Sequence, residues 1–377
     1  MPDLSQLNIE LVLLALFAFV FLLQLVIYLG TFSKLAFYKK TSTPLDQKPP
    51  VSIIMCARNE GDNLTEFLPK ILTQDYPEFE VIVVNDCSLD NTEDVLREYS
   101  KIFTNLKTIT IKEDGYYKTG KKFAMLVGIK GAKYEHLLMT DADCCPESEQ
   151  WIARMMEGYA ESKEIVLGYG AYRKESGFLN KLIRFDTFMI ALQYLSLALK
   201  NKAYMGVGRN LSYKKELFFR HKGFSTHYHI KSGDDDLFIN QAATVNNTAV
   251  VLDPESFTSS IPEKKLSAWW DQKKRHLSTA PLYKTSTKAK LGFFYTINYL
   301  FWSLFIVLLF FKNALFIALG VFLLKIIVQM VIFSGAMRRL KEKDLLPWFI
   351  LLDVVFLFLY PALHISKKFT KPNKWKN

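Results

Sequence analysis

The stretch VSIIMCARNEGDNLTEFLPKILTQDYPEFEVIVVND, residues 51–86, decides the fold. It opens with an apolar run, VSIIMCA (51–57), that predicts a buried strand, and it closes with a second such run, EVIVVND (80–86). Between them, apolar residues recur at helical spacing, at Leu64, Phe67, Leu68, Ile71 and Leu72. A strand, a helix and a second strand in close succession favour a parallel pair joined by a crossover helix.

The alternation continues along the chain. A helical pattern over 92–103 precedes a predicted strand at 106–112, and a helical pattern over 121–132 precedes a predicted strand at 136–141. Strands that alternate with helices predict a parallel sheet with helices on both faces. In such α/β sheets ligands bind outside the carboxyl ends of the strands, so the residues that follow each strand are the candidates for function.

Polar residues follow the predicted strands. They are Arg58, Asn59 and Glu60 after the first, Asn85, Asp86, Ser88 and Asp90 at the second, and Asp141 and Asp143 after the fourth. The third strand leads into EDGYYKTGKK (113–122), which is basic and contains glycine. One rim of the sheet therefore gathers carboxylates and lysines, which suits a divalent cation together with a phosphorylated ligand.

Asp141 and Asp143 stand one residue apart at the end of an apolar strand. Two carboxylates in such a place repel each other unless a cation lies between them. Mg²⁺ or Mn²⁺ would serve, since both prefer carboxylate oxygens. The alternative is a solvated turn, because aspartate is common in turns.

Several segments carry a family resemblance in their order and spacing. They are VSIIMCARNE, EVIVVNDCSLDNT, KKFAMLVGI, MTDADC, SGDDDLF and QKKRH, which lie between about Pro50 and His276. Together with flanking apolar segments they resemble the motif series of membrane-bound family 2 glycosyltransferases. The resemblance implies a GT-A fold, an α/β fold with a Rossmann-like mixed sheet, flanked here by transmembrane helices.

The resemblance also implies roles for individual residues. Ala57, Arg58 and Glu60 would line the nucleotide pocket, and Asp86 would bind the base, usually uracil. Lys122, or its neighbour Lys121, would lie near the diphosphate. Asp141 would contact the sugar or the ribose and the metal, Asp143 would bind the metal, and Gln272, Arg275 and His276 would lie by the acceptor and the diphosphate.

An inverting transfer needs a base that takes the proton of the acceptor hydroxyl. The resemblance assigns this role to Asp235 in GDDDL, with Asp234 as the alternative. Three consecutive aspartates crowd negative charge, which should raise the pKa of at least one of them. A helix N-terminus explains the same residues equally well, because aspartate caps helices and favours the dipole there, and both explanations can hold.

Two positions depart from the family pattern. His276 stands where the family's Gln-x-x-Arg-Trp motif has tryptophan, which puts polymer synthesis in doubt. Asn85–Asp86 replaces a more usual pair of aspartates, but Asp86 is kept. The segment GVGRNLSYKKELF (206–218) resembles the family's acceptor-side loop, and the amphipathic segment 177–200 suits either an interfacial helix or a core helix.

Half of the 377 residues are hydrophobic, and the excess is local. Four apolar runs, 11–29, 291–311, 314–333 and 345–365, approach the roughly 20 residues that span a bilayer as a helix. The first run has an acidic start and no small-residue cleavage site, which favours a retained anchor over a signal peptide. Whether the fourth run spans the membrane or lies flat stays open.

The net charge of +11 bears on topology and on partners. Lys34, Lys39 and Lys40 follow the first apolar run, so the positive-inside rule places the long middle segment in the cytoplasm. No nucleic-acid-binding motif accompanies the basic charge. The four cysteines lack metal-site spacing, and Cys144 and Cys145 are expected to be buried, reduced residues.

Two charges interrupt the last two apolar runs, Lys325 and Asp353. In an antiparallel helical hairpin they would lie at similar depth, and because isolated charges in lipid are costly we expect them to pair. The predicted organisation is a transmembrane helix at 8–31, a cytoplasmic catalytic domain at 48–290, a membrane region of two to three helices at 291–366 and a basic tail at 367–377.

The sequence therefore predicts a membrane-integrated inverting glycosyltransferase that uses a nucleotide sugar, most simply UDP-linked, with Mg²⁺ or Mn²⁺. The acceptor would be a lipid or a membrane-proximal glycan. Alternatives are a processive polysaccharide synthase, a non-catalytic nucleotide-sugar-binding subunit and, more remotely, a membrane oxidoreductase, although the first strand–helix turn lacks the glycine fingerprint of dinucleotide sites. The sequence indicates neither the sugar nor the oligomeric state.

Overall fold

The computed structural model describes residues 4–40, 48–112 and 120–369, which fall into two compact units. One unit combines the chain up to Tyr38 with Lys284–Phe358, and the other combines Lys39–Tyr283 with the chain from Leu359. Most of the predicted linker, most of the glycine-bearing loop and residues 370–377 of the basic tail lie outside the described residues.

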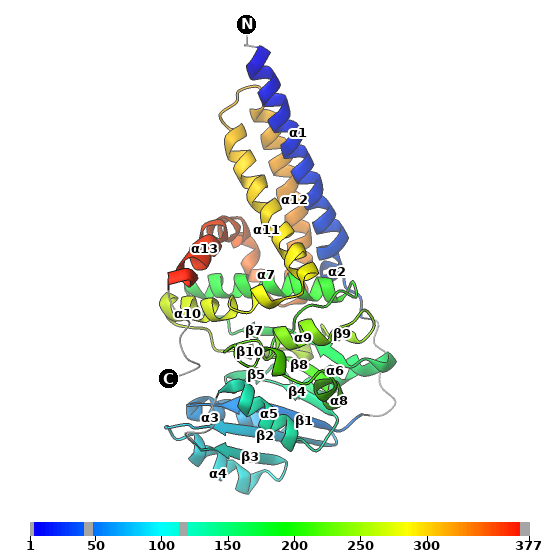
Figure 1. Ribbon diagram of the computed structural model, residues 1–377, viewed down its shortest axis with the longest axis vertical. Helices are drawn as coiled ribbons and strands as arrows, with labels where there is room; N and C mark the ends of the chain where they lie inside the picture. Colours follow the sequence, from blue (N-terminus) through cyan, green and yellow to red (C-terminus); the bar gives the residue numbers. More distant parts are fainter. Residues whose placement is uncertain (1–3, 41–47, 113–119, 370–377) are drawn as a thin grey trace. The chain divides into compact units, whose positions relative to one another are not determined.

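A mixed sheet of seven strands organises the described part of the second unit (Figure 1). Its strands in spatial order are β3 (Leu106–Ile111), β2 (Phe79–Asp86), β1 (Val51–Ala57), β4 (His136–Met139), β8 (Leu211–Lys214), β6 (Ile165–Leu167) and β9 (Thr248–Val250). The first four are parallel, as the sequence pattern predicts, whereas β8 runs antiparallel to both β4 and β6. Because β2 and β4 flank β1 on opposite sides, the strand order reverses beside β1, where α/β sheets bind ligands.

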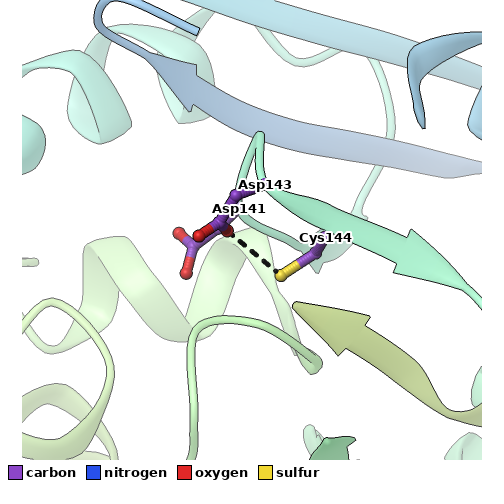
Figure 2. Close-up of side chains that lie close together, drawn as sticks. All are labelled: Asp141, Asp143 and Cys144. Atoms are coloured by element: carbon purple, nitrogen blue, oxygen red, sulfur yellow. Dashed lines mark hydrogen bonds between the residues drawn. The ribbon is translucent and has the colours of Figure 1, made fainter. Parts of the chain in front are cut away.

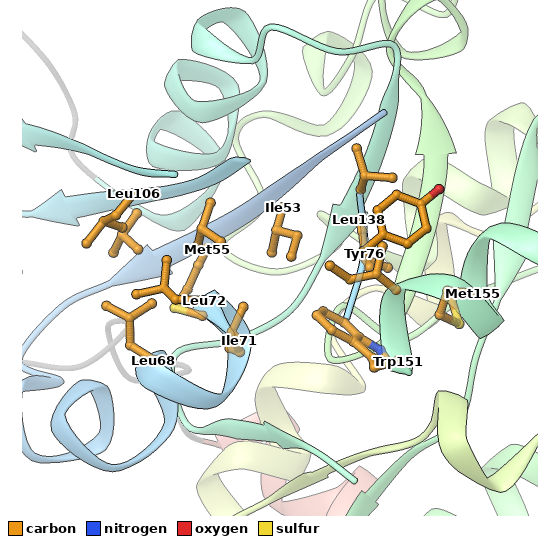
Figure 3. Packing of buried hydrophobic residues seen from close by; sticks show 14 of the residues in the cluster. Ile53, Met55, Leu68, Ile71, Leu72, Tyr76, Leu106, Leu138, Trp151 and Met155 are labelled. Atoms are coloured by element: carbon orange, nitrogen blue, oxygen red, sulfur yellow. The ribbon is translucent and has the colours of Figure 1, made fainter. Parts of the chain in front are cut away.

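Helices cover both faces of the parallel strands. They are α3 (Gly61–Leu72), α4 (Thr92–Ile102), α5 (Lys121–Gly131) and α6 (Trp151–Met156). Ile53 and Met55 of β1 pack on one face with Leu68 and Trp151 (Figure 3). On the other face α5 approaches closely, because a Cβ on Gly128 would lie only 2.8 Å from Ile54 Cγ2. The alternation of side chains along β1 thus fills two separate layers.

Three short strands among the described residues form a second sheet, and the first of them, in chain order, follows β4. It contains β5 (Cys144–Pro146), β10 (Thr258–Ser260) and β7 (Gly170–Tyr172), with β10 antiparallel to β5 and parallel to β7. The strand β5 begins directly after Asp143, and β10 precedes α10 (Leu266–His276). This small sheet therefore connects the predicted metal residues with the predicted acceptor helix.

The remaining helices of this unit include α7 (Phe178–Ala198), α8 (Lys215–Arg220) and α9 (Asp236–Ala242). Most side chains of α7 are buried, and they include the charged residues Arg184 and Asp186. Burial of charge on this scale requires polar partners inside the protein, and Asp186 has them in Lys273 and Tyr360. Within its unit α7 is therefore a core helix, which is one of the two alternatives that the sequence left open for residues 177–200.

The other unit is helical. Its long elements are α1 (Leu4–Ile27), which continues through a π-helical turn (Tyr28–Phe32) into α2 (Ser33–Ala36), then α11 (Thr285–Leu308), α12 (Leu315–Arg339) and the first part of α13 (Phe349–Phe369). Phe17 of α1 packs against Phe301 of α11, with ring centroids 4.8 Å apart. Among the described residues, four helical segments are long and apolar enough to cross a membrane, namely Ile9–Ala36, Thr285–Leu308, Leu315–Arg339 and Lys343–Lys367.

The predicted pair of charges is present in this unit. Lys325 Nζ lies 3.2 Å from Asp353 Oδ2, and both side chains are buried. Gln329 Nε2 donates to the same oxygen over 3.4 Å, and the Lys325 ammonium lies over the rings of Phe301 and Trp302. The expectation that Lys325 and Asp353 pair is confirmed.

Asp353→Leu should lower the yield of protein in the membrane fraction several-fold. Removing one partner of a buried ion pair leaves the other charge uncompensated, at a cost of about 3–5 kcal/mol. The double variant Lys325→Leu with Asp353→Leu should recover most of the yield, since no buried charge remains. Asp344→Leu, the same change at an exposed position, is the control. Equal yields for Asp353→Leu and the unmodified protein would contradict the prediction.

Candidate active site

The carboxyl ends of β1, β2 and β4 bring the predicted site residues to one edge of the sheet. Ala57 ends β1 beside Asn85 of β2, and Asp86 is the next residue along β2. Asp141 and Asp143 follow β4, which pairs with β1 on its other side. Three segments that are distant in sequence therefore meet where the pattern of strands predicts a ligand site.

Asp86 is completely buried at this edge. The nearest cation is Arg58, whose Nη1 lies 3.7 Å from Asp86 Oδ2. Burial raises the pKa of the Asp86 carboxyl, and the charge of Arg58 opposes that rise. In the described part of the chain, neither carboxylate oxygen of Asp86 has a hydrogen-bond partner. Two buried acceptors without a donor suit a ligand that brings N–H groups, such as a nucleobase.

The loops after β1 and β2 fix one another. Asn59 has a positive φ of 54°, and its backbone N–H donates to Ser88 Oγ over 2.9 Å. Asp90 accepts from the backbone N–H groups of Gly61 and Thr92, both over 3.0 Å. Glu60 is buried and accepts a hydrogen bond from Asn63 over 2.6 Å. The walls beside Asp86 are therefore held by hydrogen bonds between the two loops.

The acidic pair after β4 has a third neighbour. Ligand atoms of Asp141, Asp143 and Cys144 all lie within 4.8 Å of one another (Figure 2). The Cys144 thiol donates to Asp143 Oδ1 over 3.5 Å. Burial, followed by the charges of Asp143 and Asp141, raises the pKa of this thiol well above its ordinary value. The thiol stays protonated and orients a carboxylate, so the oxygen pair is the part that fits Mg²⁺ or Mn²⁺.

The structure confirms that Cys144 is buried, and it adds a contact with Asp143 that the sequence pattern does not predict. The spacing rules for cysteine metal sites compare cysteines and histidines with one another, and they give no signal for a single thiol beside two aspartates. The adjacency in MTDADCC was the available clue, because a residue that directly follows Asp143 can reach its carboxylate.

Two adjacent lysines at the start of α5 have different partners. Lys121 Nζ lies 2.8 Å from Asp141 Oδ1 and 3.0 Å from Asp234 Oδ2. Burial alone would lower the pKa of Lys121, but Asp141 and Asp234 outweigh it and hold that pKa well above its ordinary value. Lys122 Nζ instead donates to two backbone carbonyls, those of His227 and Ile230. Lys121, the alternative in the sequence analysis, is therefore the lysine in contact with the acidic rim.

The three aspartates of GDDDL are held in three different ways. Asp234 is buried, and although burial would raise its pKa, Lys121 lowers it below the usual range. Asp236 is buried and accepts hydrogen bonds from the hydroxyls of Thr279 and Tyr283, so it is fully engaged in structure. Burial raises the pKa of Asp236, but its carboxylate is committed to these two hydroxyls, and Asp234 is committed to Lys121.

Asp235 is half-buried and caps α9. Its Oδ1 accepts from the backbone N–H of Asp236, and its Oδ2 accepts from that of Gly208, both over 2.7 Å. Burial, followed by the charges of Asp234 and Asp236, raises the pKa of Asp235 to about 7. The expectation of a raised pKa is confirmed, and so is the helix N-terminus. A carboxylate with this pKa can exchange protons near neutrality.

The predicted acceptor residues lie on α10. Gln272 Oε1 accepts from the Tyr172 hydroxyl over 3.4 Å, and the guanidinium of Arg209 stacks on the ring of Tyr172 at 4.3 Å. Burial alone would lower the pKa of Arg209, but Tyr172 and Cys144, followed by Asp143 and Asp141, outweigh burial and raise it. The side chain of His276 is exposed, and that of Arg275 is partly exposed. Arg209 belongs to the segment GVGRN (206–210), in which the sequence pattern alone indicates no role for this arginine.

Comparisons with known proteins identify the larger unit. The model of the family "Glycosyl transferase family 2" matches residues 52–221, which contain the strand edge and both lysines of α5. The chain contains a family 2 glycosyltransferase domain. Asp235 and the helix α10 lie beyond the matched residues. The same part of the chain contributes the strands β9 and β10, which pair with β6 and β5 of the matched region.

The matches to curated relatives cover only part of the length of each relative. The chain is 29% identical over 134 residues to the poly-beta-1,6-N-acetyl-D-glucosamine synthase of Staphylococcus epidermidis, a match over 35% of this chain and 31% of that protein. It is 33% identical over 108 residues to the glycosyltransferase AglE of Haloferax volcanii, over 28% and 34%. The family 2 domain is thus related to polysaccharide synthases, and the chain spans about a third of these relatives.

A solved structure supports the fold over nearly the whole chain. The mannosyltransferase PcManGT of Pyrobaculum calidifontis, in complex with GDP-Man and Mn²⁺, aligns with a TM-score of 0.55 at 19% identity, covering 93% of this chain and 98% of that one. The fold of the family 2 domain is GT-A, with apolar helices flanking it in sequence. At this identity the likeness concerns fold alone, and the roles of the individual site residues stay predictions.

Proposed function

We propose that the protein is a membrane-integrated, inverting glycosyltransferase that transfers a sugar from a nucleotide sugar, most simply a UDP-sugar, to a lipid or a membrane-proximal glycan. The observation that carries the proposal is the bridge made by Lys121 between Asp141 and Asp234. It joins the carboxylates of the strand edge, suited to a donor, to the turn that holds Asp235, suited to proton transfer.

The donor would lie along the edge of the sheet. The nucleobase would donate an N–H hydrogen bond to Asp86, whose oxygens accept no hydrogen bond within the described part of the chain. Ala57, Arg58 and Glu60 would line the same pocket. Asp141 and Asp143 would hold Mg²⁺ or Mn²⁺, which when bound would neutralise the diphosphate. The oxygen donors fit such a hard cation, and the protonated thiol of Cys144 supports Asp143 from the side.

Asp235 would act as the base. It would take the proton of the acceptor hydroxyl while that oxygen attacks the anomeric carbon, and the bond from the sugar to the diphosphate would break, so that the nucleoside diphosphate leaves with the electron pair. Lys121 and Arg275 would offset the negative charge that develops on the leaving group. Gln272 and His276, on the same helix as Arg275, would contact the acceptor.

The apolar helices would place this chemistry at a membrane. The segments 8–31 and 291–366 would be inserted, and the domain at 48–290 would face the cytoplasm, because Lys34, Lys39 and Lys40 follow the first helix. A lipid-linked or membrane-proximal acceptor fits this location. Processive polysaccharide synthesis is the second candidate, and the similarity to a poly-beta-1,6-N-acetyl-D-glucosamine synthase favours it.

Release of nucleoside diphosphate from a panel of nucleotide sugars tests the proposal. The purified full chain with Mn²⁺ would be assayed with UDP- and GDP-linked sugars, with and without total membrane lipid extract, and lipid products would be sized by mass spectrometry. Release from one donor that rises with lipid would support a transferase, and a product ladder would favour the synthase. Failure of UDP and GDP to bind would exclude both.

The pH dependence of turnover should reveal the base. Since Asp235 must be unprotonated and its pKa is about 7, turnover should rise with pH up to about 7 and level off above it. Asp234→Asn removes a like charge, which lowers the pKa of Asp235, so the acid limb of its residual activity should move to lower pH. Thermal unfolding at each pH controls for loss of structure. An acid limb that stays in place in Asp234→Asn would contradict this account.

A further inference from the structure

Lys122 is buried beside the turn that holds the three aspartates, with only 5% of its surface exposed. Its ammonium donates to the carbonyl of His227 over 2.6 Å and to that of Ile230 over 3.0 Å. These carbonyls bound a single tight turn, because the N–H of Ile230 also donates to the carbonyl of His227. The two ends of the turn therefore converge on one lysine.

The segment that Lys122 holds is anchored at His227, which is buried and packs against Phe224, whereas the residues after it are largely exposed. The side chains of Tyr228, His229 and Lys231 are exposed, and the turn leads through Gly233 into the aspartates. Gly233 has a φ of 97°, and a Cβ there would lie 2.4 Å from Leu237 Cδ1. Only glycine therefore fits this position as it stands, and the backbone that enters α9 continues directly from the turn that Lys122 holds.

We propose that Lys122 is a positioning residue, which fixes the turn 227–230 and thereby the placement of Asp235, and that it does not bind the donor. The inference rests on the proposed function of Asp235 as the base. It differs from the role that the sequence resemblance implies for Lys122, which is contact with the nucleotide or diphosphate. Lys121, one position earlier, makes the contacts with the acidic rim instead.

The electrostatic surroundings agree with this role. Burial lowers the pKa of Lys122 to about 8, while Asp234, Asp236 and Asp235 act in the opposite direction. The Lys122 ammonium uses two of its three N–H donors on the carbonyls of the turn. Its loss would leave the carbonyl of Ile230 without this donor and the carbonyl of His227 with only the N–H of Ile230, so the turn would shift or loosen.

The test compares Lys122→Met with Lys107→Met in the full chain. Lys107 Nζ donates to the carbonyl of Gly131 over 2.8 Å, so both variants remove a lysine–carbonyl bond. For Lys122→Met we expect faster amide hydrogen exchange over residues 226–233, a UDP Kd within about twofold of the unmodified protein, and kcat lower by about 10- to 100-fold. For Lys107→Met we expect none of these changes.

The role of Lys122 and the function of the site can be judged separately. Hydrogen exchange and UDP affinity need no turnover, so they decide the role of Lys122 even if the donor or acceptor is wrongly assigned. A UDP Kd raised tenfold or more with unchanged exchange at 226–233 would overturn the proposal and assign Lys122 to the donor. If Lys122→Met does not fold, Lys122→Arg decides by the same two readouts, since arginine can still serve both carbonyls and should leave both near normal.

Discussion

Asp235→Asn is expected to lower kcat by about 10³-fold while leaving the Kd for UDP unchanged. Asparagine keeps the size of the side chain and one oxygen that can accept from a backbone N–H, but it cannot take the proton of the acceptor hydroxyl. General bases contribute roughly 10²- to 10⁴-fold to rate. Diphosphate release at saturating donor and lipid measures kcat, and calorimetric titration with UDP measures the affinity.

Asp234→Asn and Asp236→Asn are the matched comparisons for this prediction. Asp236 is engaged with Thr279 and Tyr283, so its loss should lower the melting temperature more than it alters the UDP Kd. Asp234 is the alternative base, but its ion pair with Lys121 lowers its pKa, which makes it the weaker proton acceptor. Turnover that survives in Asp235→Asn and disappears in Asp234→Asn would transfer the catalytic role to Asp234.

Asp143→Ala should remove the dependence of UDP binding on Mn²⁺ and lower turnover by about 10³-fold. A carboxylate that binds a catalytic cation supports charge neutralisation worth several kcal/mol, and about 1.4 kcal/mol corresponds to a factor of ten in rate. Titration of UDP with and without Mn²⁺ gives the binding readout, which is independent of the acceptor.

Cys144→Ser is the control for Asp143, the proposed metal ligand. Serine keeps a hydrogen-bond donor next to Asp143 and occupies less volume, so the variant should retain the Mn²⁺ dependence of UDP binding with at most a modest loss of stability. If Asp143→Ala retained tighter UDP binding in Mn²⁺ than in its absence, the cation would have to be held without Asp143.

The sequence predicts the first half of the fold closely and the second half poorly. The run Val51–Ala57 is a strand with the predicted bounds. A short, continuous apolar run of this length is typical of a strand that is covered on both faces of a parallel sheet. The strands β6, β9 and β10 have only three residues each, too few for periodicity to appear. Their positions depend on tertiary pairing with β8, β6 and β5.

The candidate site shows the same division. Asp86, Asp141 and Asp143 could be placed together because each follows a predicted strand. Lys121 and Lys122 could not be told apart, since adjacent residues point about 100° apart around a helix and only the packed structure shows which direction faces the rim. Arg209 could not be assigned either, because its position depends on stacking against Tyr172, a residue far away in sequence.

The pairing of β5 with β10 also has consequences for truncated fragments of this chain and for folding during synthesis. A fragment that stops at residue 221, the end of the family match, would lack β10, so the strand after Asp143 would lose its partner, and β6 would lose β9 and become an open edge. We expect such a fragment to aggregate and not to work as a minimal enzyme. During synthesis, the turn that holds Asp141 and Asp143 would acquire its final neighbours only after the ribosome has passed Ser260, so the proposed donor site would be among the last parts of this unit to become rigid.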